Sequence, residues 1–236
     1  MTLGEAWETH AQDWITWVRT PGHDSYDRYH RDQFLPLVGA PGRRTLDVGC
    51  GEGRLTRHLA SLGHRVVGID VSPTLVAAAR AVAPDMELHV GNAAALPFED
   101  ASFDRVVSFM CLHDVDDLDG AVHEVARVLE PGGAACLAVV HPLNSAGRFE
   151  KHERFVIRGS YLDSFRYADE AERHGLRMTF ESQHRPLAAY FDALEAAGMV
   201  VETLREPKTP DNAAWSRVPM FLHLRARKLR GRPERD

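Results

Sequence analysis

Residues 45–54 read T-L-D-V-G-C-G-E-G-R, and this stretch decides the fold. A short apolar strand runs into three alternating glycines, Gly49, Gly51 and Gly53, and a helical pattern over residues 55–61 follows at once. Glycine tolerates positive φ and has no Cβ, so a ligand can approach its backbone closely. The start of the next helix adds free N–H groups and a positive dipole end. Strand, glycine turn and helix in this order predict a site for a nucleotide-type cofactor.

The spacing of the glycines separates two kinds of cofactor. The dinucleotide fingerprint G-x-G-x-x-G needs its third glycine where this chain has Arg54. Asp47 precedes the first glycine by two residues, where a carboxylate repels a pyrophosphate and suits a cation. A nicotinamide-dependent enzyme is therefore the weakest interpretation. The pattern D-x-G-x-G-x-G instead resembles the first motif of class I S-adenosylmethionine-dependent methyltransferases, whose cofactor has a sulfonium, an ammonium group and no phosphate.

Length and composition fit an ordinary globular protein. The 236 residues suffice for one α/β domain with an embellishment, or at most two small domains. The formal net charge of −6 argues against a nucleic-acid partner, since dedicated nucleic-acid binders are normally basic. The basic residues of the tail, 228–236, are expected to form a solvated terminus.

Cysteine usage and the N-terminus bear on the compartment. The three cysteines are far apart and include no C-x-x-C, so neither a disulfide framework nor a metal site is expected. The first residues lack the basic start and apolar core of a signal peptide. No apolar run approaches the roughly 20 residues that span a bilayer. We expect a cytoplasmic protein without a membrane partner, and the sequence leaves its oligomeric state open.

Strand and helix patterns alternate after the glycine turn. Apolar strands are predicted at residues 65–70, 86–90, 104–109 and 134–140, and helices at residues 73–80, 118–129 and 186–197. Such alternation indicates a doubly wound, Rossmann-like parallel sheet covered by helices on both faces. Strands at residues 199–205 and 220–227 can add a C-terminal antiparallel hairpin, which gives a mixed seven-stranded sheet.

Two segments lie outside this alternation. Residues 1–40 are expected to form an N-terminal helical cap, with Trp7, Trp14 and Trp17 on one face of a helix over residues 3–19. Trp7 is expected to pack, while Trp14 and Trp17 can equally pack or cover the cleft. Residues 142–183, after the fifth strand, are too long for a plain connection and predict an insertion that covers the substrate. The methyltransferase domain would then span residues 41–227.

Several segments occur together in the order of one branch of this family. L-D-V-G-C-G-E-G-R, V-V-G-I-D, G-N-A-A-A-L-P-F, S-F-D-R-V-V-S and R-V-L-E-P-G-G resemble the ubiquinone/menaquinone-type (methyltransferase type 11) branch. The resemblance implies contacts from the glycine turn to the methionine part, from the acid after the second strand to the ribose, and from the pair after the third strand to the adenine. The implied cofactor-binding residues are Asp47, Gly49, Cys50, Gly51, Asp70, Val71, Asn92, Ala93 and Met110, with Tyr26 from the N-terminal turn.

One position departs from the family pattern. The family usually has Asp where this chain has Asn92, whose amide oxygen can still accept from the adenine amino group. Tyr26 has an alternative structural role of equal weight, which is to close its turn.

Three histidines are candidates for a general base, which methyl transfer needs only when the acceptor must lose a proton. His141 is the first choice, because it follows the fifth strand beside the insertion; His113 and His184 are the others. For each of them hydrogen bonding or shaping of the site is the more common role.

The expected function is S-adenosylmethionine-dependent methyl transfer to a small-molecule O-, C- or N-acceptor. The motifs of amide and DNA N-methyltransferases and of cytosine-C5 enzymes are absent from the sequence. The alternative is a regulatory or accessory protein that binds S-adenosylmethionine without transferring its methyl group. Tight binding with no transfer to any acceptor would distinguish the alternative.

Overall fold

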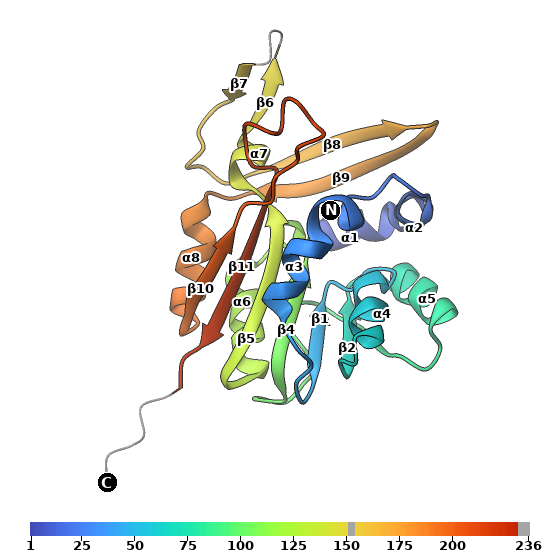
Figure 1. Cartoon of the computed structure of the whole chain (residues 1–236), viewed down its shortest axis with the longest axis vertical. Coiled ribbons are helices and arrows are strands. Elements are labelled where there is room, and N and C mark those ends of the chain that lie inside the picture. Colours follow the sequence, from blue (N-terminus) through green and yellow to red (C-terminus); the bar gives the residue numbers. More distant parts are fainter. Residues whose placement is uncertain (151–153, 231–236) are drawn as a thin grey trace.

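The structure, a computed structural model, describes residues 1–150 and 154–230 around one seven-stranded sheet (Figure 1). The sheet has the order β10-β11-β5-β4-β1-β2-β3. Its strands are β1 (Thr45–Val48), β2 (Val66–Asp70), β3 (Glu87–Val90), β4 (Phe103–Phe109), β5 (Leu129–Val140), β10 (Met199–Arg205) and β11 (Phe221–Lys228). β1 to β5 pair in parallel, whereas β11 is antiparallel to both β5 and β10. The predicted mixed sheet with its C-terminal hairpin is confirmed.

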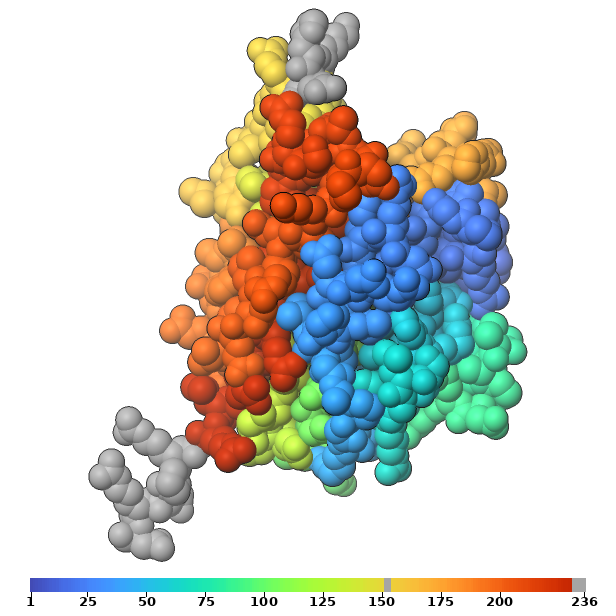
Figure 2. All heavy atoms as spheres, in the orientation of Figure 1, coloured from blue at the N-terminus to red at the C-terminus, as the bar shows by residue number. Residues whose placement is uncertain are grey.

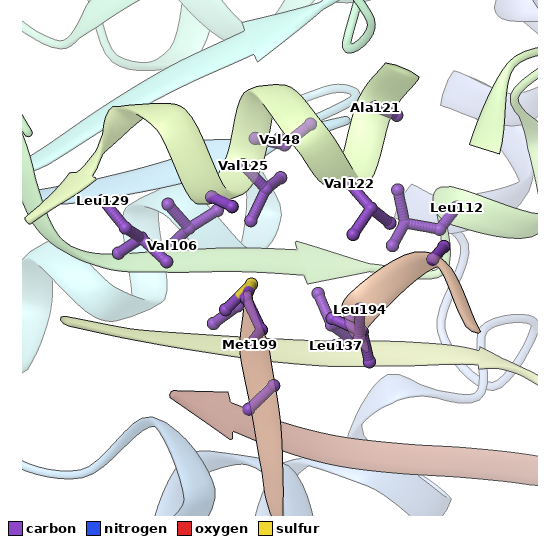
Figure 3. Packing of buried hydrophobic residues seen from close by; sticks show 14 of the residues in the cluster. Val48, Val106, Leu112, Ala121, Val122, Val125, Leu129, Leu137, Leu194 and Met199 are labelled. Atoms are coloured by element: carbon purple, nitrogen blue, oxygen red, sulfur yellow. The ribbon is translucent and has the colours of Figure 1, made fainter. Parts of the chain in front are cut away.

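Helices cover both faces of this sheet. They are α1 (Leu3–Thr9), α2 (Ala11–Arg19), α3 (Arg31–Val38), α4 (Arg54–Ser61), α5 (Pro73–Val82), α6 (Leu118–Val128), α7 (Pro142–Ala146) and α8 (Leu187–Ala196). Successive residues of a strand point to opposite faces. Val106 of β4 therefore packs with α6 and α8 in the cluster of Figure 3, while Val107 packs with α3 and α4.

Local signals place the helix that follows β2. The Ser72 hydroxyl accepts from the Leu75 N–H at 3.1 Å, and Pro73 occupies the first turn of α5. Gly53 lets α5 approach the glycine turn, because a Cβ at Gly53 would lie 3.0 Å from the Ala79 Cβ. The third glycine of the motif thus serves packing of the helix against the turn.

The N-terminal segment differs from its prediction in one respect. The helix expected over residues 3–19 is two helices that meet at His10. α1 is held at its start by Asp116, which accepts from the Leu3 N–H at 3.0 Å. The break at His10 lets both α1 and α2 pack on α5 and β9. Before α3 the chain makes a π-helical turn, η1 (Tyr26–His30).

Residues 142–184 contain α7 and two antiparallel hairpins. The hairpins are β6 (Gly147–Glu150) with β7 (Arg154–Ile157), and β8 (Phe165–Arg173) with β9 (Leu176–His184). In Figure 2 the blue N-terminal helices lie between the orange β8–β9 hairpin and the cyan-to-green region of α4 and α5. This arrangement puts the cap and the insertion next to each other at the carboxyl ends of the parallel strands (Figure 1). Within the described residues, no helix is both long and apolar enough to cross a membrane.

Candidate functional site

A cavity of about 540 Å³ lies between the carboxyl ends of the parallel strands, the N-terminal helices and β9. We divide the cavity into two parts by the residues that line it. The glycine half is lined by residues 47–51, 70–71, 92–93 and 110–111. The other part, the aromatic half, is lined by Trp7, Trp14, Trp17, His113, Asp114, Tyr167, Phe180 and Ser182. Ligands of doubly wound sheets bind at this edge.

The first two glycines of the turn have different structural roles. Both have positive φ, +75° at Gly49 and +55° at Gly51. A Cβ on Gly49 would lie 2.3 Å from the Cys111 Sγ, so Gly49 is required for packing. A Cβ on Gly51 would meet nothing closer than the Trp14 Nε1 at 3.8 Å, so the turn opens into the cavity there.

Asp70 joins the end of β2 to this turn. Its carboxylate accepts hydrogen bonds from the backbone N–H groups of Gly51 at 2.8 Å and Ser72 at 2.9 Å. Burial raises the pKa of Asp70, and these two donors oppose the rise. Lone pairs of the carboxylate remain for hydroxyl donors from a ligand.

Asp47 is a fully buried carboxyl at the base of the glycine half. Its Oδ2 accepts from the Thr56 hydroxyl at 2.7 Å, and its Oδ1 has no hydrogen-bond partner among the described residues. Burial raises the pKa of Asp47 to about 7, and the nearby Asp70 adds to the rise. A buried carboxylate without a full set of partners is stabilised by a cation. The site therefore fits a ligand with a sulfonium and an ammonium group.

Asn92 follows β3 at the exposed rim of the glycine half. Its Oδ1 accepts from the Ala94 N–H at 2.9 Å, which closes a local turn. One lone pair of that oxygen and the amide N–H₂ group remain for an adenine.

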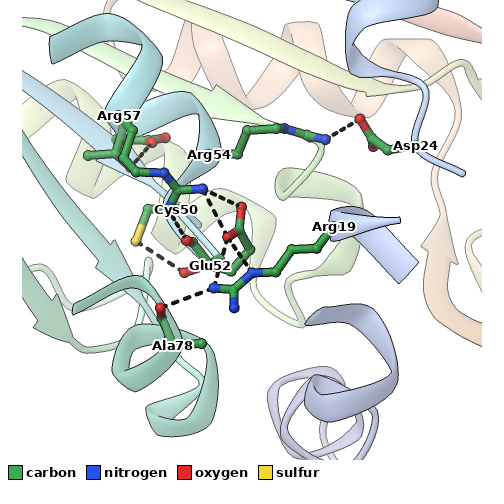
Figure 4. A network of polar contacts seen from close by, with 10 residues as sticks. Arg19, Asp24, Cys50, Glu52, Arg54, Arg57 and Ala78 are labelled. Carbon is green, nitrogen blue, oxygen red and sulfur yellow. Dashed lines mark hydrogen bonds and ion pairs between the residues drawn. The ribbon is translucent and has the colours of Figure 1, made fainter. Parts of the chain in front are cut away.

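A polar network fastens the N-terminal segment to the glycine turn (Figure 4). The buried Glu52 carboxylate accepts from Arg19 of α2 at 3.2 Å and from Arg57 of α4 at 3.0 Å. Arg54 occupies the position of the third glycine in the dinucleotide fingerprint G-x-G-x-x-G. It forms an ion pair with Asp24, and both residues line the cavity. Neither Arg54 nor Asp24 was predicted as a site residue, although an arginine in place of the glycine was a signal for this pair.

Tyr26 is absent from the lining of this cavity. Its hydroxyl pairs with the His58 Nδ1 at 2.7 Å, and its ring packs edge-on against Phe109 at 5.4 Å. The Arg54 guanidinium lies over the same ring at 4.7 Å. The geometry corresponds to the structural alternative for Tyr26, and its neighbours Asp24 and Ser25 face the cavity in its place. The other predicted cofactor residues all line the glycine half.

Of the three candidate histidines, His113 lines the cavity. It lies in the short helix η2 (Leu112–Asp114) that follows β4, and its Nδ1 has no hydrogen-bond partner among the described residues. Its Nε2 is 3.5 Å from the Asp114 Oδ1, and both side chains are buried. Burial lowers the pKa of His113 to about 3, so the ring is neutral at physiological pH.

His141 and His184 have their ring nitrogens occupied elsewhere. The His141 Nδ1 accepts from the Leu143 N–H at 3.0 Å, and its Nε2 lies 3.1 Å from Glu206. The His184 nitrogens lie 2.7 Å from the Ser145 hydroxyl and 2.9 Å from the Tyr161 carbonyl. Neither histidine lines the cavity. The His141 side chain is the N-cap of α7, and of the three candidates only His113 is among the described lining residues.

The wall of the aromatic half comes from two segments that are distant in sequence, the N-terminal helices and the β8–β9 hairpin. Trp14 touches Trp7 at 5.8 Å and Phe180 at 6.0 Å between ring centroids, both edge-on, and Trp17 lies 6.4 Å from Phe180. Tyr167 of β8 lines the same part.

Within the described residues, no group of three or more His, Cys, Asp or Glu side chains is placed to hold a metal ion.

The sequence and fold were compared with known proteins. Residues 46–137 match the family described as methyltransferase domain. The chain carries a methyltransferase domain. An uncharacterized methyltransferase of Synechocystis is 36% identical over 117 residues, which are 49% of this chain and 55% of that protein. The demethylmenaquinone methyltransferase of Tropheryma whipplei is 40% identical over 139 residues, 56% of this chain and 57% of that protein.

The chain therefore spans about half the length of these curated relatives. Among solved structures, an S-adenosylmethionine-dependent methyltransferase from Mesorhizobium loti has a TM-score of 0.69 at 26% identity and covers 83% of this chain and 96% of its own. The family and its cofactor, S-adenosylmethionine, are those predicted from the sequence.

Proposed function

We propose that this protein transfers a methyl group from S-adenosylmethionine to a small-molecule acceptor. The observation that carries the proposal is the continuity of the cavity, in which the glycine half and the aromatic half share one space of about 540 Å³. A cavity of this size suits small ligands. The demethylmenaquinone activity belongs to the named relative; this chain shares with it a domain that does not specify the acceptor.

The chain's residues have separate tasks in this proposal. Asp47, Gly49 and Gly51 hold the methionine part, Asp70 holds the ribose, and Asn92 with Ala93 meets the adenine. The cofactor supplies a methyl group on a positively charged sulfur. The two halves of the cavity place the acceptor next to that methyl group and exclude water, and this positioning supplies most of the catalysis. His113 is neutral and lines the cavity, so it can orient the acceptor or share its proton.

Calorimetric titration with S-adenosylmethionine, S-adenosylhomocysteine and NAD tests the cofactor assignment. We expect micromolar binding of the first two and no heat from NAD. NAD binding, or no binding of S-adenosylmethionine, would overturn the proposal. Tight binding with no methyl transfer to a broad acceptor panel would favour the accessory-protein alternative.

A matched pair of variants then tests the histidine assignment. We expect His113→Gln to lower turnover about tenfold, the loss expected when one hydrogen bond that orients the acceptor is removed. His141→Gln, which lies outside the cavity, should stay within about twofold of the wild type. Equal losses in both variants would contradict the assignment of His113.

A further inference from the structure

The aromatic half is built to receive positive charge. Its edge-on rings form a wall from α1, α2 and β9, with Trp14 between Trp7 and Phe180. The electron-rich faces of tryptophan rings attract ammonium groups, and the attraction is largest where water is excluded. An apolar ligand body is stabilised by the same wall through buried area.

Asp114 provides a second, independent observation in this half. Its side chain is 7% exposed, and its Oδ1 has no hydrogen-bond partner among the described residues. It lines the cavity, with the His113 Nε2 3.5 Å away. Buried polar atoms are normally hydrogen-bonded in native proteins, so an unpaired carboxylate oxygen at a cavity wall marks a place for a donor from a ligand.

The groups that face Asp114 are one cation and several neutral side chains. Arg185 lies nearby, but it donates to the carbonyl oxygens of Leu112, Val115 and Asp116. His113 is neutral, and burial raises the pKa values of Tyr167 and Tyr190, so both phenols stay protonated. Burial raises the pKa of Asp114 to about 8, although Ser182, Trp7 and Arg185 oppose the rise. Without a cation Asp114 is therefore mostly protonated at pH 7, and an ammonium ligand favours its ionised form.

The cavity as a whole has a one-sided charge. Among its described lining residues, Arg54 is the one lysine or arginine, and it is already paired with Asp24. Three of the eight acidic lining residues, Asp24, Glu52 and Asp116, form ion pairs with arginines. The other five have no lysine or arginine partner among the described residues; they are Asp47, Asp70, Asp114, Asp117 and Asp169. Such a field concentrates cations and repels carboxylates and phosphates.

We propose that the methyl acceptor is a small amine, which places its nitrogen at Asp114 and its apolar or aromatic body against the wall of Trp7, Trp14 and Phe180. The inference rests on methyl transfer as the proposed function. In the transfer, the bound ammonium group first passes one proton to the ionised Asp114 Oδ1, which frees the nitrogen lone pair. This lone pair forms the new N–C bond, and the S–C bond breaks with its electron pair on sulfur. The products are a methylated ammonium ion, a protonated Asp114 and a neutral thioether, and Asp114 returns its proton to solvent when the product leaves.

Matched ligand series test this inference without requiring turnover. The probes are phenethylamine, tryptamine and cyclohexylethylamine, each with the alcohol and the carboxylic acid of the same body. They are titrated into the full chain saturated with S-adenosylhomocysteine, with the heat of binding as readout. We expect at least one amine to bind ten times more tightly than its alcohol and its acid.

Variants locate the binding group. Asp114→Asn keeps the shape and removes the charge, and should weaken amine binding about tenfold while leaving S-adenosylhomocysteine affinity unchanged. Asp114→Glu keeps the carboxylate and should retain the preference for the amine. Asp119→Asn makes the same charge change on the exposed start of α6 and serves as the control.

The outcomes distinguish a failure of this inference from a failure of the proposed function. If no amine binds more tightly than its alcohol, or if Asp114→Asn binds amines like the wild type, the inference is wrong and methyl transfer stands. If S-adenosylhomocysteine itself does not bind, the proposed function fails as well. A tenfold amine preference that Asp114→Asn removes and Asp114→Glu restores supports the inference.

Discussion

The glycine half and the aromatic half of the cavity are assembled in different ways. The glycine half comes from short segments directly after β1, β2, β3 and β4, whose parallel pairing sets their ends side by side. The aromatic half comes from α1, α2, η2, β8 and β9, which lie up to 175 residues apart, as between Trp7 and Ser182. Its geometry depends on the docking of the cap on the insertion.

The two halves of the cavity also differ in the groups that line them and in the segments that supply those groups. The glycine half presents backbone groups and carboxylates, which we propose recognise the cofactor. The aromatic half uses side chains from segments outside the match at residues 46–137, except for the η2 pair His113 and Asp114. The four predictions below test whether the two halves are as independent as this arrangement implies.

The largest effect is expected from Gly49→Ala. The new Cβ would overlap the Cys111 side chain at a positive φ, so we expect a loss of about 3 kcal/mol in the free energy of unfolding, measured by urea denaturation. Gly175→Ala in the β8–β9 turn has a similar φ of +79° and no neighbour within 4 Å, and should lose only about 1 kcal/mol. Equal losses would show that the contact with Cys111 is unimportant. Gly49→Ala with Cys111→Gly should recover the difference.

Asp70→Ala is expected to affect the glycine half alone. The variant loses the acceptor for the N–H groups of Gly51 and Ser72, and with it the proposed ribose contact. We expect S-adenosylhomocysteine to bind about 100-fold more weakly by calorimetry. Asp85→Ala removes the same charge from an exposed turn and is the control. Affinity within threefold of the wild type would exclude Asp70 from the cofactor site.

The buried Asp47 carboxyl makes the free energy of unfolding depend on pH near neutrality. Its pKa is about 7 in the folded state, whereas an unfolded aspartate titrates near pH 4. Between these values the folded chain binds more protons, so the contribution of this group to the free energy of unfolding falls as pH rises, by at most about 1.4 kcal/mol per unit.

Asp47→Asn should remove this dependence. The stability of the variant relative to the wild type is expected to increase from pH 5 to pH 7 and to level off at pH 8, in urea denaturation at each pH. The same variant should lose cofactor affinity. Parallel stability curves would mean that the Asp47 carboxyl is not raised in pKa.

The smallest effect is expected in the aromatic half. Trp14→Leu keeps an apolar side chain but removes the ring between Trp7 and Phe180. We expect about threefold weaker binding of the amine that binds best, from the loss of a cation–π contact, with S-adenosylhomocysteine affinity unchanged. Trp215→Leu, whose ring packs on Phe149 and Phe155 outside the cavity, is the matched control. A larger loss for the cofactor than for the amine would show that the two halves are coupled.

The glycine half could be predicted because its signals are local. A strand, a turn that needs positive φ, and an acid at the next strand end are each specified by neighbouring residues, and parallel pairing brings strand ends together without further information. The predicted positions Gly51, Asp70 and Asn92 accordingly line one cavity. Tyr26 does not line this cavity, and nothing local distinguishes a side chain that faces the cavity from one that turns toward His58.

Only the tertiary structure decided the rest. His141 and His113 both follow strands, yet the cap of α7 engages the His141 ring, while η2 presents His113 and Asp114 to the cavity. The contact of Trp14 with Phe180 likewise joins residues 166 positions apart, and the helix before the break at His10 is anchored by Asp116, 113 positions from Leu3. The sequence by itself determined the sheet, the glycine turn and the kind of cofactor, because periodicity and turn chemistry are short-range. The aromatic half was decided by packing between distant segments, whose side-chain directions no short-range pattern encodes.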